Sequence, residues 1–258
     1  MGRILTIVNQ KGGVGKTTTA VNLSAALAEA GEPTLLVDMD PQGNSSSGLG
    51  VDKDNLQHCC YDLLLGQVTV SEVLQSTAMP MLNVIPATMA LVGAEIEMVS
   101  LTKREFRLQD ALTPLRDTFN YIIIDCPPSL GLLTLNALCA ADSVLIPVQC
   151  EFYALEGVSQ LLRTISLVQQ KLNPHLTIEG ALLTMFDGRL NLNSQVANEI
   201  RRYFGDKVYR TQVPRNVRLS EAPSHGLPVL LYDSKSRGAA CYRDLAQEVM
   251  ANSASVSG

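Results

Sequence analysis

Short apolar runs alternate along the chain with longer segments in which apolar residues recur at helical spacing. Uninterrupted apolar runs are typical of strands that are buried on both faces of a sheet. They predict strands over 4–8, 34–37, 82–86, 121–124, 143–148 and 177–184. Helical spacing predicts helices over 18–28, 61–65, 70–74, 89–100, 104–118, 154–171, 192–205 and 238–251. This alternation predicts an α/β fold, with a mostly parallel twisted β-sheet and helices on both faces.

The chain of 258 residues shows no linker, so a single domain over 1–258 is expected, with a disordered polar tail over about 252–258. No apolar run approaches the length of a membrane span. The first strand begins almost at the N-terminus, which leaves no room for a signal peptide. The six cysteines include no C-x-x-C pair, which favours small core residues in a reducing cytosol over metal ligands or disulfides.

The formal charge of −5 is unevenly distributed. Residues 1–149 carry 8 Lys and Arg against 15 Asp and Glu, whereas residues 150–258 carry 12 against 10. The net negative charge argues against a chain coated with nucleic acid, and any contact with a polyanion is expected on the C-terminal half.

A glycine-rich segment connects the first predicted strand to the first predicted helix. Glycines let backbone N–H groups close around phosphate oxygens, and the positive end of the helix dipole favours an anion there. Lys16 would reach the β- and γ-phosphates, and the Thr17 hydroxyl would ligate Mg²⁺. Gln10 stands where the common phosphate-binding motif has a glycine, and Lys11 adds a second cation at the start of the loop. The candidate ATP-binding residues here are Lys11, Gly12, Gly13, Val14, Gly15, Lys16, Thr17 and Thr18.

Three aspartates follow two of the predicted strands. Asp38 and Asp40 come after the strand over 34–37, and Asp125 comes after the strand over 121–124. Ligands of open α/β sheets bind at the carboxyl ends of the strands, so these carboxylates are expected beside the glycine-rich loop. They would hold Mg²⁺ and an attacking water there. The alternative for Asp38 and Asp40 is that they only cap a strand-end turn.

The loop K-G-G-V-G-K-T-T resembles the deviant Walker A motif of a class of P-loop NTPases that contains the ParA/Soj partition ATPases, MinD and the nitrogenase iron protein. The resemblance implies that Lys11 reaches the phosphates of a partner subunit in a nucleotide-sandwich dimer. It implies that Asp40 orients the hydrolytic water, that Asp38 supports its loop, and that Asp125 is the Walker B residue of the Mg²⁺ shell. The implied catalytic set is Lys11, Lys16 and Asp40, and the implied metal set is Thr17, Asp40 and Asp125.

The segment over 213–224 resembles the ParA/Soj proteins in particular. The resemblance implies that Pro214 and Asn216 flank adenine and that nearby basic residues contact DNA. The candidates are Arg189, Arg215 and Arg218, with Lys235, Arg237 and Arg243 as weaker ones. The alternative for each arginine is a solvated or ion-paired surface residue. No recognition helix is evident, so contacts would go to phosphates, independent of base sequence and weakened by salt.

The resemblance extends over nearly the whole chain and implies a cycle that uses ATP and Mg²⁺. An ATP-bound homodimer would bind double-stranded DNA nonspecifically, and hydrolysis stimulated by a ParB/Spo0J-like partner would return the monomer. The expected location is the cytoplasm, on the nucleoid, without membrane contact.

Three other functions remain as alternatives. A MinD-like membrane-cycling ATPase would need a basic amphipathic C-terminal helix, and the sequence has no Lys or Arg after Arg243. A relative of the nitrogenase iron protein would need cysteines placed to bridge an iron–sulfur cluster, whereas Cys59 and Cys60 are adjacent and the others are scattered. A GTPase would carry an N-K-x-D signature, which the sequence lacks.

Overall fold

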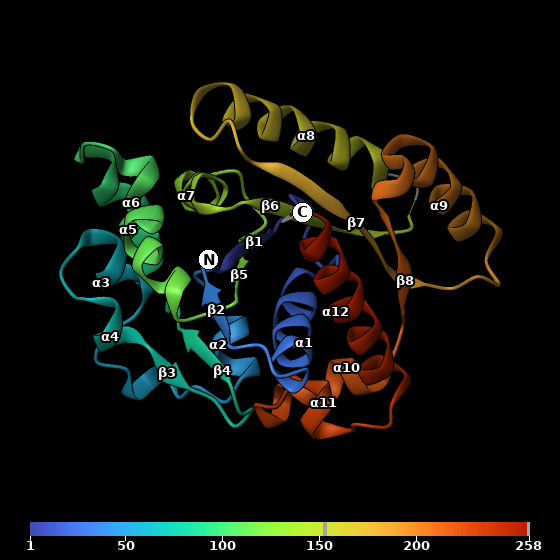
Figure 1. Cartoon of the computed structure of the whole chain (residues 1–258), viewed down its shortest axis with the longest axis horizontal. Helices are drawn as coiled ribbons and strands as arrows, with labels where there is room; N and C mark the ends of the chain where they lie inside the picture. The colour runs from blue at the N-terminus through green and yellow to red at the C-terminus, as the bar shows by residue number, and fades with distance from the viewer. Residues whose placement is uncertain (152–153, 257–258) are drawn as a thin grey trace.

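The computed structural model describes residues 1–151 and 154–256, which form an eight-stranded sheet between two layers of helices (Figure 1). The strand order is β3-β4-β2-β5-β1-β6-β7-β8, and every neighbouring pair is parallel except β3 and β4. The strands are β1 (Arg3–Ile7), β2 (Thr34–Asp38), β3 (Gln75–Ser76), β4 (Leu82–Ile85), β5 (Tyr121–Asp125), β6 (Ser143–Gln149), β7 (Thr177–Phe186) and β8 (Val208–Pro214). The predicted α/β class is confirmed.

The helices follow the strands in βαβ order. The longer helices are α1 (Lys16–Glu29), α7 (Leu132–Ala140), α8 (Ala154–Lys171), α9 (Asn191–Phe204) and α12 (Arg237–Val256). The shorter ones are α2 (Asn44–Gly48), α3 (Cys60–Leu65), α4 (Val70–Val73), α5 (Leu91–Glu97), α6 (Arg107–Leu112), α10 (Val217–Glu221) and α11 (Val229–Tyr232). No helix in the described part of the chain is long and apolar enough to cross a membrane.

The sheet separates two hydrophobic cores. Alternate residues of β1 show this: Ile4 packs in the core with α3, α5, α6, α7, α8 and α9, whereas Leu5 packs in the core with α1, α11 and α12. Figure 1 shows α7 and α8 on one side of the sheet and α1 and α12 on the other. The central strands are therefore buried on both faces, as their continuous apolar sequences predicted.

The register of the central strands determines where the site lies. Ile7 at the end of β1 pairs with Asp125, and Asp38 at the end of β2 pairs with the same Asp125. The carboxyl ends of β1, β2 and β5 therefore meet at one edge of the sheet. This edge carries the glycine-rich loop and two of the predicted carboxylates.

The structure differs from the predicted elements at several places. The strands β3 and β8 were not predicted, because β3 has two residues and β8 has only two buried positions, Tyr209 and Val213. The helix expected over 104–118 is a 3₁₀ turn, then α6, then a second 3₁₀ turn that contains Pro114. Proline cannot donate the helical hydrogen bond, which explains the break. The last helix extends to Val256 and not to 251, so most of the expected polar tail lies within α12.

Candidate active site

The glycine-rich loop lies between the end of β1 and the first residue of α1, Lys16. Gly15 adopts φ 88°, a left-handed conformation that suits glycine, and it caps α1. The Thr184 hydroxyl, from the distant strand β7, donates to the Val14 carbonyl at 2.8 Å. The Asn9 side chain accepts from the Lys11 N–H at 3.0 Å and donates to the Pro147 carbonyl at 2.7 Å. Neighbouring strands thus hold the loop in place.

Lys16 is almost fully buried, with 7% of its surface exposed. Its ammonium donates to the Lys11 carbonyl at 3.2 Å, across the glycine-rich loop. Burial lowers the pKa of Lys16, and the nearby Asp125 carboxylate opposes that shift. A buried cation with a loop carbonyl as its hydrogen-bond acceptor is suited to bind an anion that enters the loop.

Lys11 makes its contact in another direction. Its ammonium lies 2.5 Å from Glu151 Oε2, at the start of the segment after β6, and both side chains are more than a third exposed. The side chain of Gln149 donates to the other oxygen of Glu151. In the single chain Lys11 is therefore part of an ion pair near the surface, whereas Lys16 is enclosed.

The predicted carboxylates lie together. Asp38 and Asp125 are completely buried, and Asp40 is 8% exposed. Asp40 Oδ1 accepts the Gln42 N–H at 2.9 Å, and Asp38 Oδ1 accepts the Asp40 N–H at 3.1 Å. Burial raises the pKa of both Asp38 and Asp125, and repulsion from neighbouring carboxylates adds to it. A cation at this point would relieve that repulsion.

The residues present fit a magnesium ion that is shared with phosphate oxygens. Asp125 Oδ1 is buried and has no hydrogen-bond partner among the described residues, so it is available to a cation or to its bound water. Thr17 lies near Asp125 and opposes the rise in its pKa. No group of three His, Cys, Asp or Glu side chains in the described ranges could hold a metal by itself. Magnesium in phosphate sites normally takes one or two carboxylates and completes its shell with phosphates and waters.

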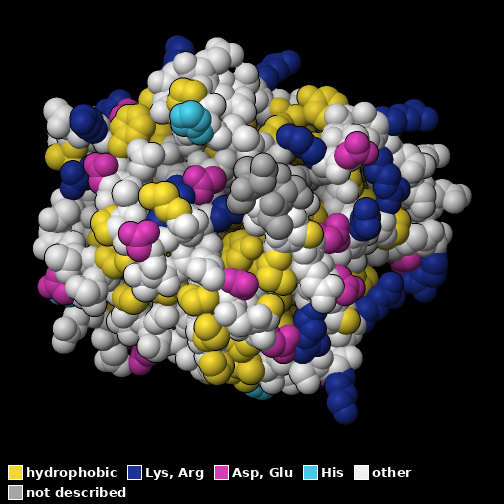
Figure 2. All heavy atoms as spheres, in the orientation of Figure 1, with side chains coloured by type: hydrophobic (Ala, Val, Ile, Leu, Met, Phe, Trp, Pro, Cys, Tyr) yellow, Lys and Arg dark blue, Asp and Glu magenta, His cyan; other side chains and the backbone are white. Residues whose placement is uncertain are grey.

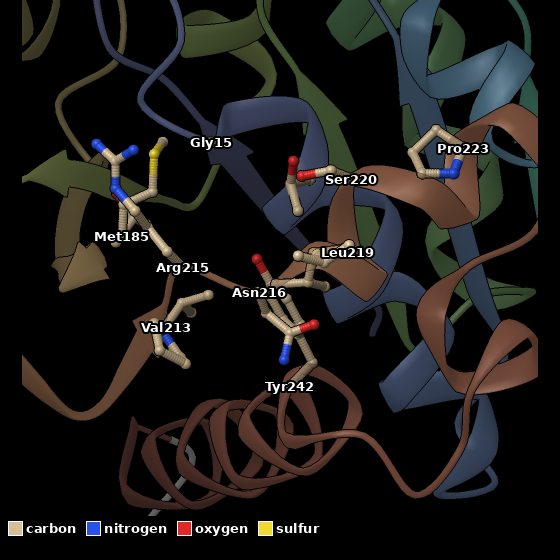
Figure 3. Close-up of a pocket in the computed structure, with 13 residues that line it drawn as sticks. Gly15, Met185, Val213, Arg215, Asn216, Leu219, Ser220, Pro223 and Tyr242 are labelled. Carbon is tan, nitrogen blue, oxygen red and sulfur yellow. The ribbon is translucent and has the colours of Figure 1, made fainter. Parts of the chain in front are cut away.

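A cavity of about 440 Å³ opens beside the glycine-rich loop. Its lining includes Gly15 and Thr18, the end of β8 and the segment that follows β8. Figure 3 shows Gly15 together with Val213, Arg215 and Asn216 around the cavity. Pro214 and Asn216 both line it, as the predicted adenine contacts would have to. The Asn216 side chain accepts from the Arg218 N–H at 2.9 Å and so caps α10. The cavity therefore adjoins the glycine-rich loop.

The candidate DNA-contacting arginines are only partly brought together. Arg189 and Arg215 line one hollow of about 600 Å³ with Arg237, whereas Arg218 does not line it. Arg189 forms an ion pair with Asp187 at 2.6 Å, and Arg218 with Glu221 at 2.8 Å and Asp233 at 3.1 Å.

The weaker candidates differ in the same way. Arg243 forms an ion pair with Glu29, whereas Lys235 and Arg237, like the main candidate Arg215, form none with any described residue. Lys and Arg side chains gather along the right-hand side of the molecule, over the region of α9 and β8 (Figure 2).

Several residues of the site were not singled out by the sequence analysis. Ser45 and Ser46 of α2 donate to the buried carboxylates, and Thr184 holds the loop. Met185, which lines the cavity, has φ 50°, an unusual value for a residue other than glycine. The two serines directly follow the D-x-D-P-Q-G-N stretch, and this position was the one available signal. Nothing in the sequence marked Thr184.

Comparison with known proteins identifies close relatives. A family model described as an AAA domain matches residues 2–178. The sporulation initiation inhibitor protein Soj of Bacillus subtilis is 61% identical over 98% of this chain and 100% of its own length. The chromosome partitioning protein ParA of Myxococcus xanthus is also 61% identical, over 97% of this chain and 88% of its own length.

Solved structures share the fold over nearly the whole chain. One from Mycobacterium smegmatis, described as cobyrinic acid a,c-diamide synthase with bound ATP analogue and magnesium, is 41% identical. Its TM-score is 0.88, and the match covers 99% of this chain and 97% of the M. smegmatis chain. The cell division ATPase MinD of Pyrococcus furiosus is 29% identical with a TM-score of 0.80, over 97% of this chain and 99% of its own length.

Proposed function

Since the chain belongs to the Soj/ParA family of chromosome-partitioning ATPases, we propose that it hydrolyses ATP with Mg²⁺ in a cycle that carries it onto and off DNA. The observation that carries the proposal is the meeting of the two-lysine loop with three carboxylates at one edge of the sheet. The M. smegmatis neighbour is described by a different activity, but it is 41% identical, against 61% for Soj and ParA. The partition role is therefore favoured.

In the proposed reaction, backbone N–H groups from Gly12 to Thr18 hold the phosphates and Lys16 stabilises the charge that develops on them. Asp40 orients the water that attacks the γ-phosphorus. Bound Mg²⁺, held near Thr17 and Asp125, would neutralise phosphate charge. The nucleoside would lie in the cavity beside Pro214 and Asn216.

Lys11 is proposed to act on the phosphates of a second copy of the chain. To do so Lys11 must break its ion pair with Glu151. Both side chains are partly exposed, so breaking the pair costs little free energy. An exposed ion pair contributes about 1 kcal/mol or less, because water and salt screen it. A lysine placed in trans would supply charge in the transition state as an arginine finger does. Dimerisation would then be a condition for efficient hydrolysis.

This role in trans can be tested by mixing two inactive variants. Lys11→Ala keeps Asp40, and Asp40→Ala keeps Lys11, so only a mixed dimer contains a complete site. Random mixing makes half of the dimers mixed, so we expect recovery of about a quarter of wild-type hydrolysis. A mixture that dimerises in sedimentation experiments but stays inactive would refute the role.

DNA binding is proposed for the ATP-bound form, through Arg189, Arg215 and Arg218, and ParB-type stimulation of hydrolysis would end it. The deciding measurement is the affinity for nonspecific duplex with ATP analogue or ADP, at low and moderate salt. We expect binding with the ATP analogue alone, weakened by salt because it releases counterions.

The variant for this measurement replaces the three arginines by alanine. Its matched control replaces Lys103, Arg163 and Lys171, three exposed cations outside the candidate set. Loss of DNA binding in the first variant and retention in the control would support the proposed surface. Binding that does not depend on the nucleotide, or no binding by the wild type, would overturn the DNA-partition role.

A further inference from the structure

Helix α2 begins immediately after the loop over 39–43, which contains Asp40. Two consecutive serines of this helix contact two buried aspartates. The Ser45 hydroxyl donates to Asp125 Oδ2 at 2.7 Å. The hydroxyl and backbone N–H of Ser46 donate to Asp38 Oδ2 at 2.7 and 2.8 Å. All four residues are completely buried. Such contacts cannot be replaced by solvent if the serine is removed.

The turn that leads into α2 is tightly constrained. Gly43 has φ 62°, and a Cβ atom there would lie 2.5 Å from the Ala87 carbonyl oxygen. Only glycine fits both the conformation and the space. The constrained turn at Gly43 therefore sets the position of the two serines relative to the aspartates.

The two serines have different surroundings. Ser46 Oγ also accepts the Ala87 N–H at 2.9 Å, so Ser46 joins the Asp38 loop to the segment after β4. Ser45 Oγ has Asp125 as its hydrogen-bond partner. The second oxygen of Asp125, Oδ1, is buried and has no hydrogen-bond partner among the described residues.

We propose that Ser45 is a positioning residue for the magnesium end of the site. By holding Oδ2, Ser45 fixes the rotation of the Asp125 carboxylate and leaves Oδ1 available to Mg²⁺ or to one of its waters. Without the hydroxyl, the carboxylate loses the donor that fixes its rotation. Hydrogen bonds to a metal-binding carboxylate commonly change metal affinity by 10- to 100-fold. The inference rests on the proposed nucleotide site.

The test compares Ser45→Ala with Ser45→Cys and with Ser46→Ala as a matched control. A fluorescent ATP analogue is titrated into each variant in EDTA and at a series of Mg²⁺ concentrations, without DNA or partner protein. For Ser45→Ala we expect that about tenfold more Mg²⁺ is needed to raise the affinity for the nucleotide to the same extent. The affinity for the nucleotide in EDTA should stay unchanged. Ser45→Cys keeps the shape with a weaker donor, so its Mg²⁺ dependence should fall between wild type and alanine.

Ser46→Ala should lower the unfolding temperature and leave the Mg²⁺ dependence within about twofold, because Ser46 does not contact Asp125. If Ser45→Ala does not fold, the cysteine variant carries the test. Wild-type Mg²⁺ dependence in the folded Ser45 variants would overturn the role of Ser45 alone. A wild-type chain that binds no nucleotide would instead overturn the proposed function, and the role of Ser45 with it.

Discussion

Two regions of the molecule use charge in opposite ways. The phosphate-binding end of the site contains Lys16 and the buried aspartates, and the basic face of the C-terminal half carries Arg189, Arg215 and Arg218. At the phosphate end Lys16, Asp38 and Asp125 are buried, and each forms a hydrogen bond within the site. On the basic face Arg189 is 89% exposed, and its partner Asp187 is two residues away. One region is buried and interlocked by hydrogen bonds, whereas the other consists of exposed ion pairs.

This difference teaches what each region can do. Buried charges that lose a partner are strongly destabilised, so the phosphate end has a fixed geometry suited to chemistry. Exposed ion pairs contribute about 1 kcal/mol or less, so the arginines can exchange carboxylates for the phosphates of a polymer. Substitutions should therefore produce large, specific effects in the first region and small, salt-dependent effects in the second.

The largest effect is expected from Asp40→Ala. Removing a group that orients and activates the attacking water typically lowers the rate 10²- to 10⁴-fold, and we expect a loss of that order in single-turnover phosphate release. ATP affinity should change by only a few fold, because Lys16 and the loop remain. Asp40→Asn is the control that keeps the size of the side chain. Hydrolysis near the wild-type rate in Asp40→Ala would show that the water is activated elsewhere.

On the basic face, Arg215→Ala and Arg218→Ala separate DNA contact from structure. Each contact with a phosphate contributes about 0.9 to the slope of log K against log salt concentration, so each substitution should reduce that slope by about this amount. Of the two arginines only Arg218 joins α10 to Asp233, so only Arg218→Ala should also lower the free energy of unfolding. An equal loss of stability in both variants would contradict this distinction. DNA titrations at several salt concentrations and urea unfolding provide both measurements.

The same contrast explains how much the sequence alone could predict. Asp38 and Asp125 were predictable because a continuous apolar run determines both a buried strand and the point at which it ends. Parallel pairing then brings those two ends together, as the register shows. The glycine-rich loop was predictable for the same reason, since it had to connect β1 to α1.

Features that depend on contacts between distant segments were not predictable. Ser45 and Ser46 stand in a polar stretch that resembles a loop, and the five-residue helix α2 bonds to carboxylates on other strands. The pairing of Arg218 with Asp233 depends on how α10 and α11 fold against each other. Because β8 has few buried apolar residues, the sequence did not predict this strand. In the structure β8 forms one edge of the seven parallel strands.

Thr184→Val tests whether the interlocked region extends to β7. The substitution removes the hydrogen bond to the Val14 carbonyl and leaves that oxygen buried, which should destabilise the fold by about 1–3 kcal/mol. Because the loop loses an anchor, ATP affinity should also fall several-fold. Thr6→Val is the matched control, since the buried Thr6 hydroxyl donates to the Ala137 carbonyl away from the loop. Equal ATP affinity in the two variants would limit the role of Thr184 to stability.

The smallest effect is expected from Arg243→Ala, which removes the partly exposed ion pair with Glu29. The hydrogen bond from Arg243 is the main cause that lowers the pKa of Glu29 from its ordinary value of 4.5. A carboxylate with a lowered folded-state pKa contributes stability above its unfolded pKa and loses it as the pH falls through the folded value. The difference between wild type and variant should therefore be about 1 kcal/mol or less at pH 7 and should shrink below about pH 4.5. It should also shrink in 1 M salt, because salt screens exposed pairs and leaves the buried carboxylates largely unaffected. Urea unfolding at several pH values and salt concentrations measures this difference in stability. A difference that persists in acid and in 1 M salt would show that Arg243 behaves like the buried, interlocked residues.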